Sequence, residues 1–264
     1  GEEDDAQNPE QHAERIVRGG IGRREPGRDE EAAQPAKDDA RGQQRDGCLM
    51  GPAAFRVAGL ARSLSDLGIA SEDWGDVTPG PLREVTCPNP AVHHLAETVA
   101  WTEALAAKGA AAMTTGFPIF MGGDHSLSLG SVAGMAAHAA TVGRPLFVLW
   151  LDAHSDYHTP LTTQSGNLHG TPVAYIAGKP GFDAFPPFPA PVPAECICLY
   201  GIRSVDPAEH AGLLDSDLTI CDMRALDEQG IVAPLRTFLE RVAAANGLLH
   251  VSLDVDFLDP GIAP

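Results

Sequence analysis

Five short apolar runs alternate with longer stretches of helical spacing, and this alternation limits the fold more than any other feature of the chain. Each run is rich in branched or aromatic residues, which is typical of a buried strand. The runs are FPIFM (117–121), PLFVLWL (145–151), ECICLY (195–200), DLTICD (217–222) and LLHVSLDV (248–255). Strands and helices in alternation predict a parallel sheet that helices cover on both faces. We therefore expect a three-layer α/β/α architecture with a central, mostly parallel sheet.

The first 40 residues differ from the rest in composition. They are dense in charge, and their only large aliphatic side chains are Ile16, Val17 and Ile21. Burial of so little apolar surface does not offset the entropy that ordering would remove. We predict a charged, disordered leader over residues 1–40 and a folded domain over residues 41–264.

The charge balance limits the class of partner. The chain has 36 acidic and 18 basic residues, a formal net charge of -18. This excess disfavours nucleic acid, whose phosphates need a basic face, and it suits a small cationic partner. No apolar stretch reaches the roughly 18 to 20 residues that span a bilayer, and the acidic N-terminus lacks the layout of a secretion signal. We expect a cytoplasmic protein that binds no nucleic acid and no membrane. The five cysteines show no C-x-x-C spacing and are expected to be structural.

Ionisable side chains stand where three of the apolar runs end. They are Asp152, His154 and Asp156 in WLDAHSDYH, Asp254 and Asp256 in SLDVDFLDP, and His125 in GGDHS. An extended backbone sends alternate side chains to one side, and the carboxyl ends of parallel strands meet at one edge of a sheet. We therefore expect these six side chains to converge.

A metal centre explains such a cluster best. Carboxylates packed together without a cation would repel one another and lose hydration, and divalent ions would compensate them. Any one of these motifs alone is more often a cap, a turn or a satisfied core group, but three strand ends together favour ligands. Six ligands are too many for one open catalytic ion, so two ions fit better. Carboxylate and imidazole ligands suit Mn²⁺, with Co²⁺, Ni²⁺ and Zn²⁺ as alternatives.

The motifs GGDHS, DAHSD and SLDVDFLDP resemble the three metal motifs of the ureohydrolase family, in the family's order. The resemblance covers residues 41–264 and implies the arginase-like fold with two Mn²⁺ ions. It implies one ion held by His125, Asp152, Asp156 and Asp254, and a second held by Asp152, His154, Asp254 and Asp256. Asp152 and Asp254 would bridge the two ions.

The segment SGNLHG (165–170) resembles the part of arginases that recognises an amino-acid head group. The resemblance implies that Ser165 and Asn167 contact the α-carboxylate and that His169 lies near the metals as a proton shuttle. Hydroxyl and amide donors suit a carboxylate. The alternative is that SGN caps a helix that begins at Leu168.

A second segment, GIRSVDPAEH, also resembles arginases. The resemblance implies that Asp206 binds the α-ammonium group and that Glu209 is a more distant helper. The alternative is a plain turn before a helix. His158 stands where many arginases carry an asparagine that contacts the substrate carboxylate, and it can donate a hydrogen bond there instead.

The activity that the resemblance implies is hydrolysis of the guanidinium group of L-arginine to urea and L-ornithine. Asp156 would pass a proton to the departing amine, and His169 would help to restore the nucleophile. The resemblance also implies a homo-oligomer, a trimer or a hexamer. The sequence stops at DPGIAP, before the further strand, helices and glutamate of arginases, so we expect the fold to be incomplete at both ends. The alternatives are another ureohydrolase, such as a guanidinobutyrase or an agmatinase, and a non-catalytic metal-binding fragment.

Overall fold

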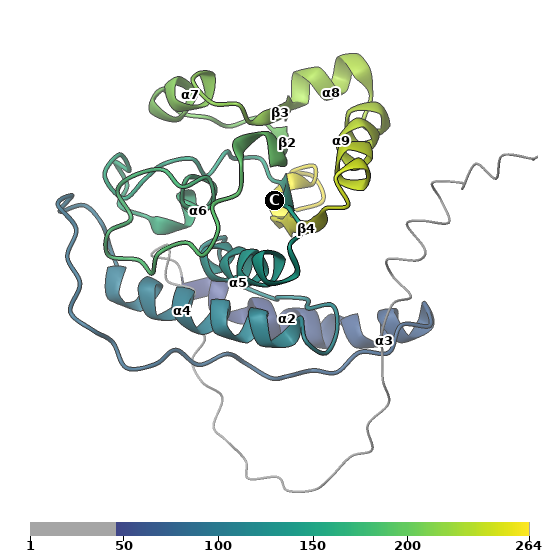
Figure 1. The fold of residues 1–264 in the computed structure, drawn as a ribbon, viewed down its shortest axis with the longest axis horizontal. Coiled ribbons are helices and arrows are strands. Elements are labelled where there is room, and N and C mark those ends of the chain that lie inside the picture. The colour runs from purple at the N-terminus through teal and green to yellow at the C-terminus, as the bar shows by residue number, and fades with distance from the viewer. Residues whose placement is uncertain (1–45, 264) are drawn as a thin grey trace, which may run out of the picture.

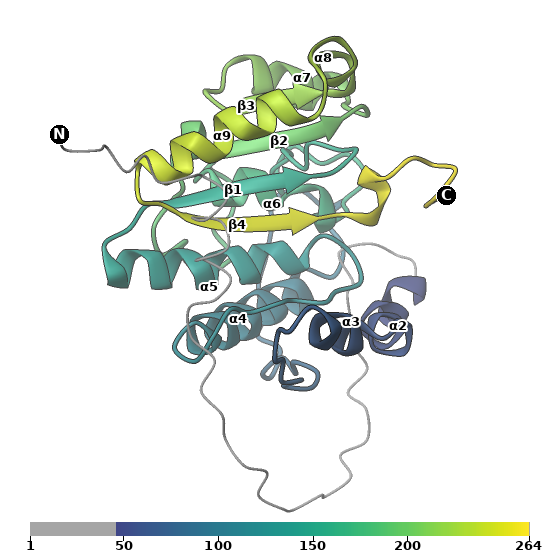
Figure 2. The same cartoon turned by 90° about the vertical axis from the view of Figure 1, so that its right-hand side faces the viewer.

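The central sheet has four strands, all parallel, in the computed structural model, which describes residues 46–263. The strands are β1 (Leu146–Leu151), β2 (Ile197–Ile202), β3 (Thr219–Asp222) and β4 (Leu248–Leu253). Their order across the sheet is β3-β2-β1-β4, and Figure 2 shows them running in one direction. The prediction of a parallel central sheet is confirmed. The predicted leader, residues 1–40, lies outside the described residues.

Helices lie on both sides of this sheet, as predicted. They are α2 (Gly51–Ala58), α3 (Leu60–Asp66), α4 (Leu95–Ala112), α5 (Leu127–Val142), α6 (Pro172–Ile176), α7 (Pro207–Leu214), α8 (Met223–Gln229) and α9 (Val232–Ala244). Short 3₁₀ turns occur at Asp46–Met50, Leu168–Gly170, Ala194–Cys196 and Val255–Phe257. In Figure 1, α8 and α9 lie to the right of the strands and α6 lies to the left. The three layers of the predicted architecture are therefore present.

β1 is an interior strand, and its sequence explains why. It pairs with β2 on one side and with β4 on the other, so both of its edges are hydrogen-bonded. Every residue of LFVLW is buried, and Val148 and Trp150 are fully enclosed. A continuous apolar run of this kind is what a strand covered on both faces requires.

α5 covers one face of the sheet. It packs against β1 and β4, and α4 packs against it on the outside, as Figure 2 shows. Because α5 is enclosed between the sheet and α4, its small and apolar residues are buried along most of its length. None of the described helices is long and apolar enough to cross a membrane.

The prediction of a strand over residues 117–121 is wrong. This run has no regular secondary structure and pairs with none of the described strands, and Phe117 and Ile119 are 78% and 51% exposed. A strand needs a ladder of backbone hydrogen bonds to a neighbour, and apolar composition alone does not supply one. The run still leads into GGDHS and brings His125 to the start of α5.

The helical pattern between Phe55 and Leu67 is divided in two. Gly59 has φ of 87°, which ends α2 and begins α3. Glycine adopts this left-handed conformation without the steric penalty that a side chain brings, so it interrupts a helix readily. Val57 and Leu67 are exposed as a result, and the apolar spacing of this segment does not correspond to a buried face.

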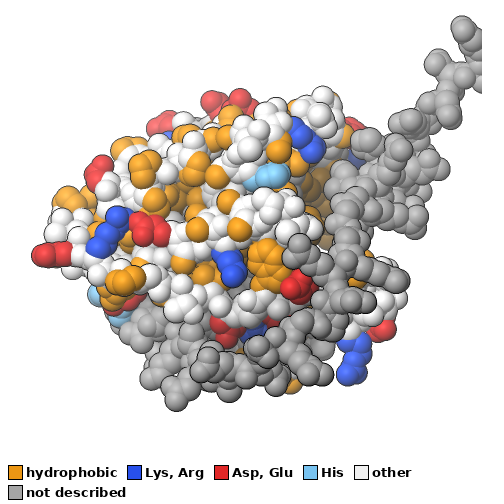
Figure 3. All heavy atoms as spheres, turned by 60° about the horizontal axis from the view of Figure 1, so that its bottom comes forward, with side chains coloured by type: hydrophobic (Ala, Val, Ile, Leu, Met, Phe, Trp, Pro, Cys, Tyr) orange, Lys and Arg blue, Asp and Glu red, His pale blue; other side chains and the backbone are white. Residues whose placement is uncertain are grey.

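The face near α2 and α4 has a mixed surface. Figure 3 shows apolar side chains exposed there between charged ones, and the described basic side chains in this view stand apart from one another.

Candidate metal centre

The carboxyl ends of β1 and β4 place two aspartates side by side. Asp152 follows β1 directly, and Asp254 follows β4. The Asp152 amide donates to the carbonyl of Tyr200, and the Asp254 amide donates to the carbonyl of Leu151, at 3.2 and 2.9 Å. Because these bonds continue the sheet past its last residues, the two side chains emerge at one edge.

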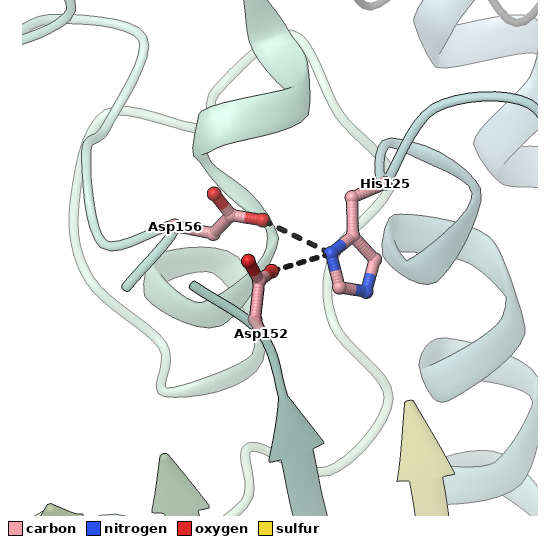
Figure 4. Close-up of side chains that lie close together, drawn as sticks. All are labelled: His125, Asp152 and Asp156. Carbon is pink, nitrogen blue, oxygen red and sulfur yellow. Dashed lines mark hydrogen bonds and ion pairs between the residues drawn. The ribbon is translucent and has the colours of Figure 1, made fainter. Parts of the chain in front are cut away.

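Three carboxylates converge on one nitrogen of His125. Nδ1 of His125 lies 2.8 Å from Oδ2 of Asp152, 3.3 Å from Oδ2 of Asp156 and 3.4 Å from Oδ2 of Asp254. Figure 4 shows Asp152 at the end of β1 and Asp156 in the loop beyond it, both turned towards the His125 ring. His125, Asp152 and Asp156 are all buried. This first group has the composition of a metal site.

A second group forms around His154. Its Nδ1 lies 3.4 Å from Oδ1 of Asp152 and 3.0 Å from Oδ2 of Asp256. His154 is about half exposed, so this group faces the solvent side of the cluster. His154, Asp152 and Asp256 also have the composition of a metal site.

Asp152 belongs to both groups. Its Oδ2 faces His125 and its Oδ1 faces His154. The backbone amide of His154 and the indole Nε1 of Trp150 also donate to this carboxylate, at 2.8 and 3.0 Å. The arrangement gives two adjacent positions for a cation with one carboxylate between them.

The histidines carry the marks of a strongly negative site. Burial lowers the pKa of His125, but hydrogen bonds to Asp152 and Asp156 outweigh this effect and raise the pKa to about 10. Hydrogen bonds to Asp152 and Asp256 raise the pKa of His154 to about 10 as well. Without a metal both rings are therefore protonated at neutral pH and act as the cations of the cluster.

The carboxylates divide into two kinds. Burial raises the pKa of Asp156, and the negative charge of Asp152 adds to this. Burial also raises the pKa of Asp254. Burial acts in the same direction on Asp152, but hydrogen bonds from His125 and His154 are stronger and lower its pKa. Asp156 and Asp254 thus lack full compensation for their negative charge.

A divalent metal fits this donor set. The ion pairs of Asp152, Asp156, Asp254 and Asp256 within residues 46–263 involve His125 and His154, and none involves lysine or arginine. Two protons on imidazoles compensate four carboxylates incompletely, whereas two dications would balance them. Oxygen donors with imidazole nitrogen are ligands that Mn²⁺ and similar ions accept.

The backbone at Asp156 supports a specialised role for this residue. Its φ is 46°, in the left-handed region that residues other than glycine rarely adopt. Its carbonyl accepts a hydrogen bond from the amide of Val173 at 3.0 Å, which holds the loop after β1 against the start of α6. Strain of this kind persists where the surrounding structure fixes the residue, and it is frequent at functional sites.

Two residues of the cluster were not identified from the sequence. The ring of Trp150 stacks on His125, and Oγ of Ser252 lies 2.8 Å from Nε2 of His125. Trp150 precedes Asp152 by two positions, and Ser252 precedes Asp254 by two positions. Since alternate residues of a strand face the same side, this spacing is a signal that could have found them.

The segment SGNLHG lies close to the cluster. Burial lowers the pKa of His169, and the charges of Asp124, His154 and Asp254 also act on this ring. Asn167 precedes a 3₁₀ turn, Leu168–Gly170, and its side chain makes no capping hydrogen bond to that turn. The alternative that SGN caps a helix is thus not supported. Ser165 is exposed and accepts a hydrogen bond from the amide of Asn167 at 3.3 Å.

A third group consists of His158, Asp206 and Glu209, and it too has the composition of a metal site. Nε2 of His158 is 2.6 Å from Oδ2 of Asp206, and the amides of Ala208 and Glu209 donate to Oδ1 of Asp206. Burial raises the pKa of Asp206, but these hydrogen bonds outweigh it and hold the pKa below its usual range. Asp206 is therefore the N-cap of α7, as the turn alternative requires, and its Oδ2 is turned to His158.

Glu209 joins α7 to the loop after β1. Its Oε1 accepts hydrogen bonds from the hydroxyl of Ser155 at 2.7 Å and from the amide of Tyr157 at 2.9 Å. The Glu209 side chain is buried. These hydrogen bonds therefore hold the loop between Asp152 and His158, and the carboxylate does not face the solvent.

Comparisons with known proteins agree on one family. The family model described as the arginase family matches residues 35–264. An arginase of Agrobacterium fabrum is 53% identical over 224 residues, which are 84% of this chain and 69% of that protein. An arginase of Brucella suis is 52% identical over 224 residues, 84% of this chain and 73% of that protein.

Solved structures give the same result. An arginase from Bacillus subtilis superposes with a TM-score of 0.69 at 33% identity and covers 83% of this chain and 72% of that one. An arginase from Bacillus caldovelox superposes with a TM-score of 0.70, also at 33% identity, over 83% of this chain and 73% of the other.

Proposed function

Because this chain belongs to the arginase family, we propose that it hydrolyses the guanidinium group of L-arginine to urea and L-ornithine with two manganese ions. The observation that carries the proposal is the pair of adjacent ligand groups that share Asp152. Each group joins one imidazole to carboxylates, and a pair of ions needs a bridging carboxylate between them.

We propose the ligand sets that the resemblance to the family implies, and the contacts within each group support them. One ion would be held by His125, Asp152, Asp156 and Asp254, and the other by Asp152, His154, Asp254 and Asp256. Support for Asp254 as a ligand comes from its 3.4 Å approach to Nδ1 of His125. Bound ions would supply a nucleophile at neutral pH by lowering the pKa of water from 15.7 to about 7.

Proton transfer would fall to Asp156 and His169. Asp156 would accept a proton from the nucleophile and pass it to the departing amine. Burial lowers the pKa of His169, which favours its neutral imidazole, and this ring would accept a proton from the site. The two groups would therefore act in opposite directions.

Recognition of the amino-acid end would fall to the loops beyond β1 and β2. Ser165 and Asn167 offer a hydroxyl and an amide to the α-carboxylate, and Asp206 offers a carboxylate to the α-ammonium group. Nδ1 of His158 lies 3.2 Å from the hydroxyl of Thr162, and Nε2 lies 2.6 Å from Asp206. His158 would donate to the substrate carboxylate in place of one of these contacts. Glu209 would support them by fixing the loop.

The test is urea release by the purified chain after removal of metal and reloading with Mn²⁺. We expect L-arginine to be preferred over agmatine and 4-guanidinobutyrate, since only L-arginine has both head-group charges. Preference for agmatine would contradict the assignment of Ser165 and Asn167, and preference for 4-guanidinobutyrate would contradict the assignment of Asp206. Metal binding without urea from any of the three would contradict the enzymatic proposal itself.

Asp156→Asn tests the proposed role of this carboxylate. We expect this variant to lose turnover, because an amide is a weaker metal ligand than a carboxylate and cannot hold and release the proton. Full activity in Asp156→Asn would contradict its proposed role.

We further propose that the chain forms a homo-oligomer, a trimer or a hexamer. Sedimentation velocity tests this by measuring the mass of the particle in solution.

A further inference from the structure

A segment far from the metal motifs holds the loop that carries Ser165 and Asn167. The segment is residues 87–93, just before α4, and the loop is residues 160–167. The side-chain amide of Asn89 donates to the carbonyl of Pro160 at 3.0 Å and to the carbonyl of Thr163 at 2.9 Å. Both donor hydrogens of this amide are thus used on one turn of the loop.

The orientation of the Asn89 amide is itself fixed. Its Oδ1 accepts a hydrogen bond from the amide of Ala91 at 3.1 Å, which closes a local turn in the segment. Asparagine combines an acceptor for its own backbone with two donors for another chain. An aspartate has the acceptor but no donors, and its charge would face two carbonyl oxygens.

A second contact holds the loop at its other end. The amide of His93 donates to the carbonyl of Gly166 at 3.0 Å, and Gly166 has φ of 75°. A Cβ at Gly166 would lie 1.7 Å from the carbonyl oxygen of Ala91, so the backbone of the segment occupies the space of a side chain. The segment and the loop therefore have one relative position.

The loop transmits this position to Ser165 and Asn167. The hydroxyl of Thr163, whose carbonyl Asn89 holds, accepts from the amide of Gly166 at 3.2 Å. Oγ of Ser165 in turn accepts from the amide of Asn167 at 3.3 Å. Oγ of Ser165 also lies 3.4 Å from the hydroxyl of Thr163. Asn89 thus acts on the loop backbone, which sets the position of Ser165 and Asn167.

We propose that Asn89 is a positioning residue for recognition of the substrate carboxylate, a role that rests on the proposed function of Ser165 and Asn167. It holds the turn at Pro160–Thr163 and thereby sets where the two carboxylate donors stand. Its contribution concerns the head group of the substrate, and the metal centre keeps its own supports from β1 and β4.

The experiment compares Asn89→Asp with Asn246→Asp in the full chain loaded with Mn²⁺. Asn246 is exposed and precedes the amino end of β4, whereas the cluster lies at the carboxyl ends of the strands. Asn246→Asp therefore makes the same change of charge far from the loop. We expect Asn89→Asp to raise KM for L-arginine about tenfold with kcat within about twofold, since misplaced binding groups weaken ground-state and transition-state binding alike.

Inhibition by agmatine distinguishes a loss of carboxylate recognition from a general loss of structure. It has the same guanidinium group but no carboxylate, so its inhibition constant against L-arginine should stay within about twofold in Asn89→Asp. A parallel rise in the agmatine constant, a fall in bound Mn²⁺, or an unchanged KM for L-arginine would overturn the proposal. Asn89→Ala, which adds no charge, should show the same pattern more weakly and serves if the aspartate variant does not fold.

Amide hydrogen exchange tests the role of Asn89 independently of whether L-arginine is the substrate. Amides of residues 163–167 should exchange faster in Asn89→Asp than in Asn246→Asp, whether or not L-arginine is a substrate. Unchanged exchange would overturn the role of Asn89 alone. Absence of urea from the wild-type chain together with faster exchange would overturn the proposed function and the recognition role with it.

Discussion

The indole ring of Trp150 stacks on the imidazole ring of His125, with centroids 3.9 Å apart and planes inclined by 14°. The same indole donates its Nε1 hydrogen to Asp152 at 3.0 Å. One buried side chain of β1 thus orients two proposed metal ligands that come from separate parts of the chain. Supports of this kind affect metal affinity, because a ligand held in place loses less entropy when it binds.

Trp150→Phe should weaken Mn²⁺ binding about tenfold, because phenylalanine keeps an aromatic ring beside His125 but has no hydrogen to donate to Asp152. Titration of the metal-free protein followed by electron paramagnetic resonance measures the affinity. Trp101→Phe, at a partly buried position on α4, is the matched control and should leave it unchanged. Equal affinities in the two variants would contradict this role of the indole.

Metal binding should release protons, and its affinity should rise with pH. Hydrogen bonds to carboxylates raise the pKa of His125 and of His154 to about 10, although burial opposes this for both rings, so both are protonated at pH 7. A metal ion binds only the neutral ring. The apparent affinity should therefore increase between pH 6 and pH 9, by about tenfold per pH unit for each proton released.

Calorimetry in two buffers of different ionisation enthalpy counts these protons. We expect a positive release at pH 7.5 and a smaller one for His154→Ala, which removes one of the two protonated rings. Binding with no proton release at this pH would show that His125 and His154 are not ligands.

Asp156→Asn should stabilise the metal-free protein at pH 8. Burial and the charge of Asp152 raise the Asp156 pKa, so this carboxyl favours its neutral form in the folded state. A carboxyl whose pKa is raised in the folded state destabilises the fold progressively as the pH rises from the unfolded-state pKa to the raised value, and a neutral amide removes this effect. Asparagine also tolerates the left-handed backbone at this position. We expect Tm to rise by about 2 to 4 °C, which corresponds to about 1 kcal/mol.

The pH dependence gives the control for this prediction. At pH 5 the Asp156 carboxyl is protonated, so the difference in Tm from the wild type should shrink. In excess Mn²⁺ the order should reverse, since only the wild type gains its full binding energy. A variant that is less stable than the wild type at pH 8 without metal would contradict the account.

Glu209→Ala should destabilise the fold more than Glu209→Gln. The glutamine keeps an oxygen that accepts from Ser155 and from the amide of Tyr157, whereas alanine leaves both buried donors without a partner. An unsatisfied buried donor costs about 1 to 3 kcal/mol. Thermal unfolding of both variants measures the difference, and equal Tm values would show that these two hydrogen bonds do not hold the loop.

Sequence patterns predicted the parts of the fold in which local spacing and burial agree. β1 was predicted because its uninterrupted apolar run needs cover on both faces, and the aspartates after β1 and β4 follow from the alternation of side chains along a strand. β4 was also predicted as a buried strand, but it lies at the edge of the described sheet, and Val251 and Leu253 are 49% and 59% exposed. The strand over residues 117–121 was predicted wrongly, because strand formation depends on a neighbour that composition does not reveal.

The support around the site was harder to predict for a related reason. Ser252 reaches His125 across 127 positions of sequence, and Asn89 reaches Thr163 across 74. No local pattern specifies such contacts, since a serine on a strand or an asparagine in a loop has many possible partners. The motifs indicated the proposed ligands, and only the fold showed what holds them.

The shared position of Asp152 implies that the two proposed metal positions are not independent. An ion beside His125 and an ion beside His154 would draw on the two oxygens of one carboxylate. By linkage, occupancy of either position should change the affinity of the other by the same factor, whichever is filled first.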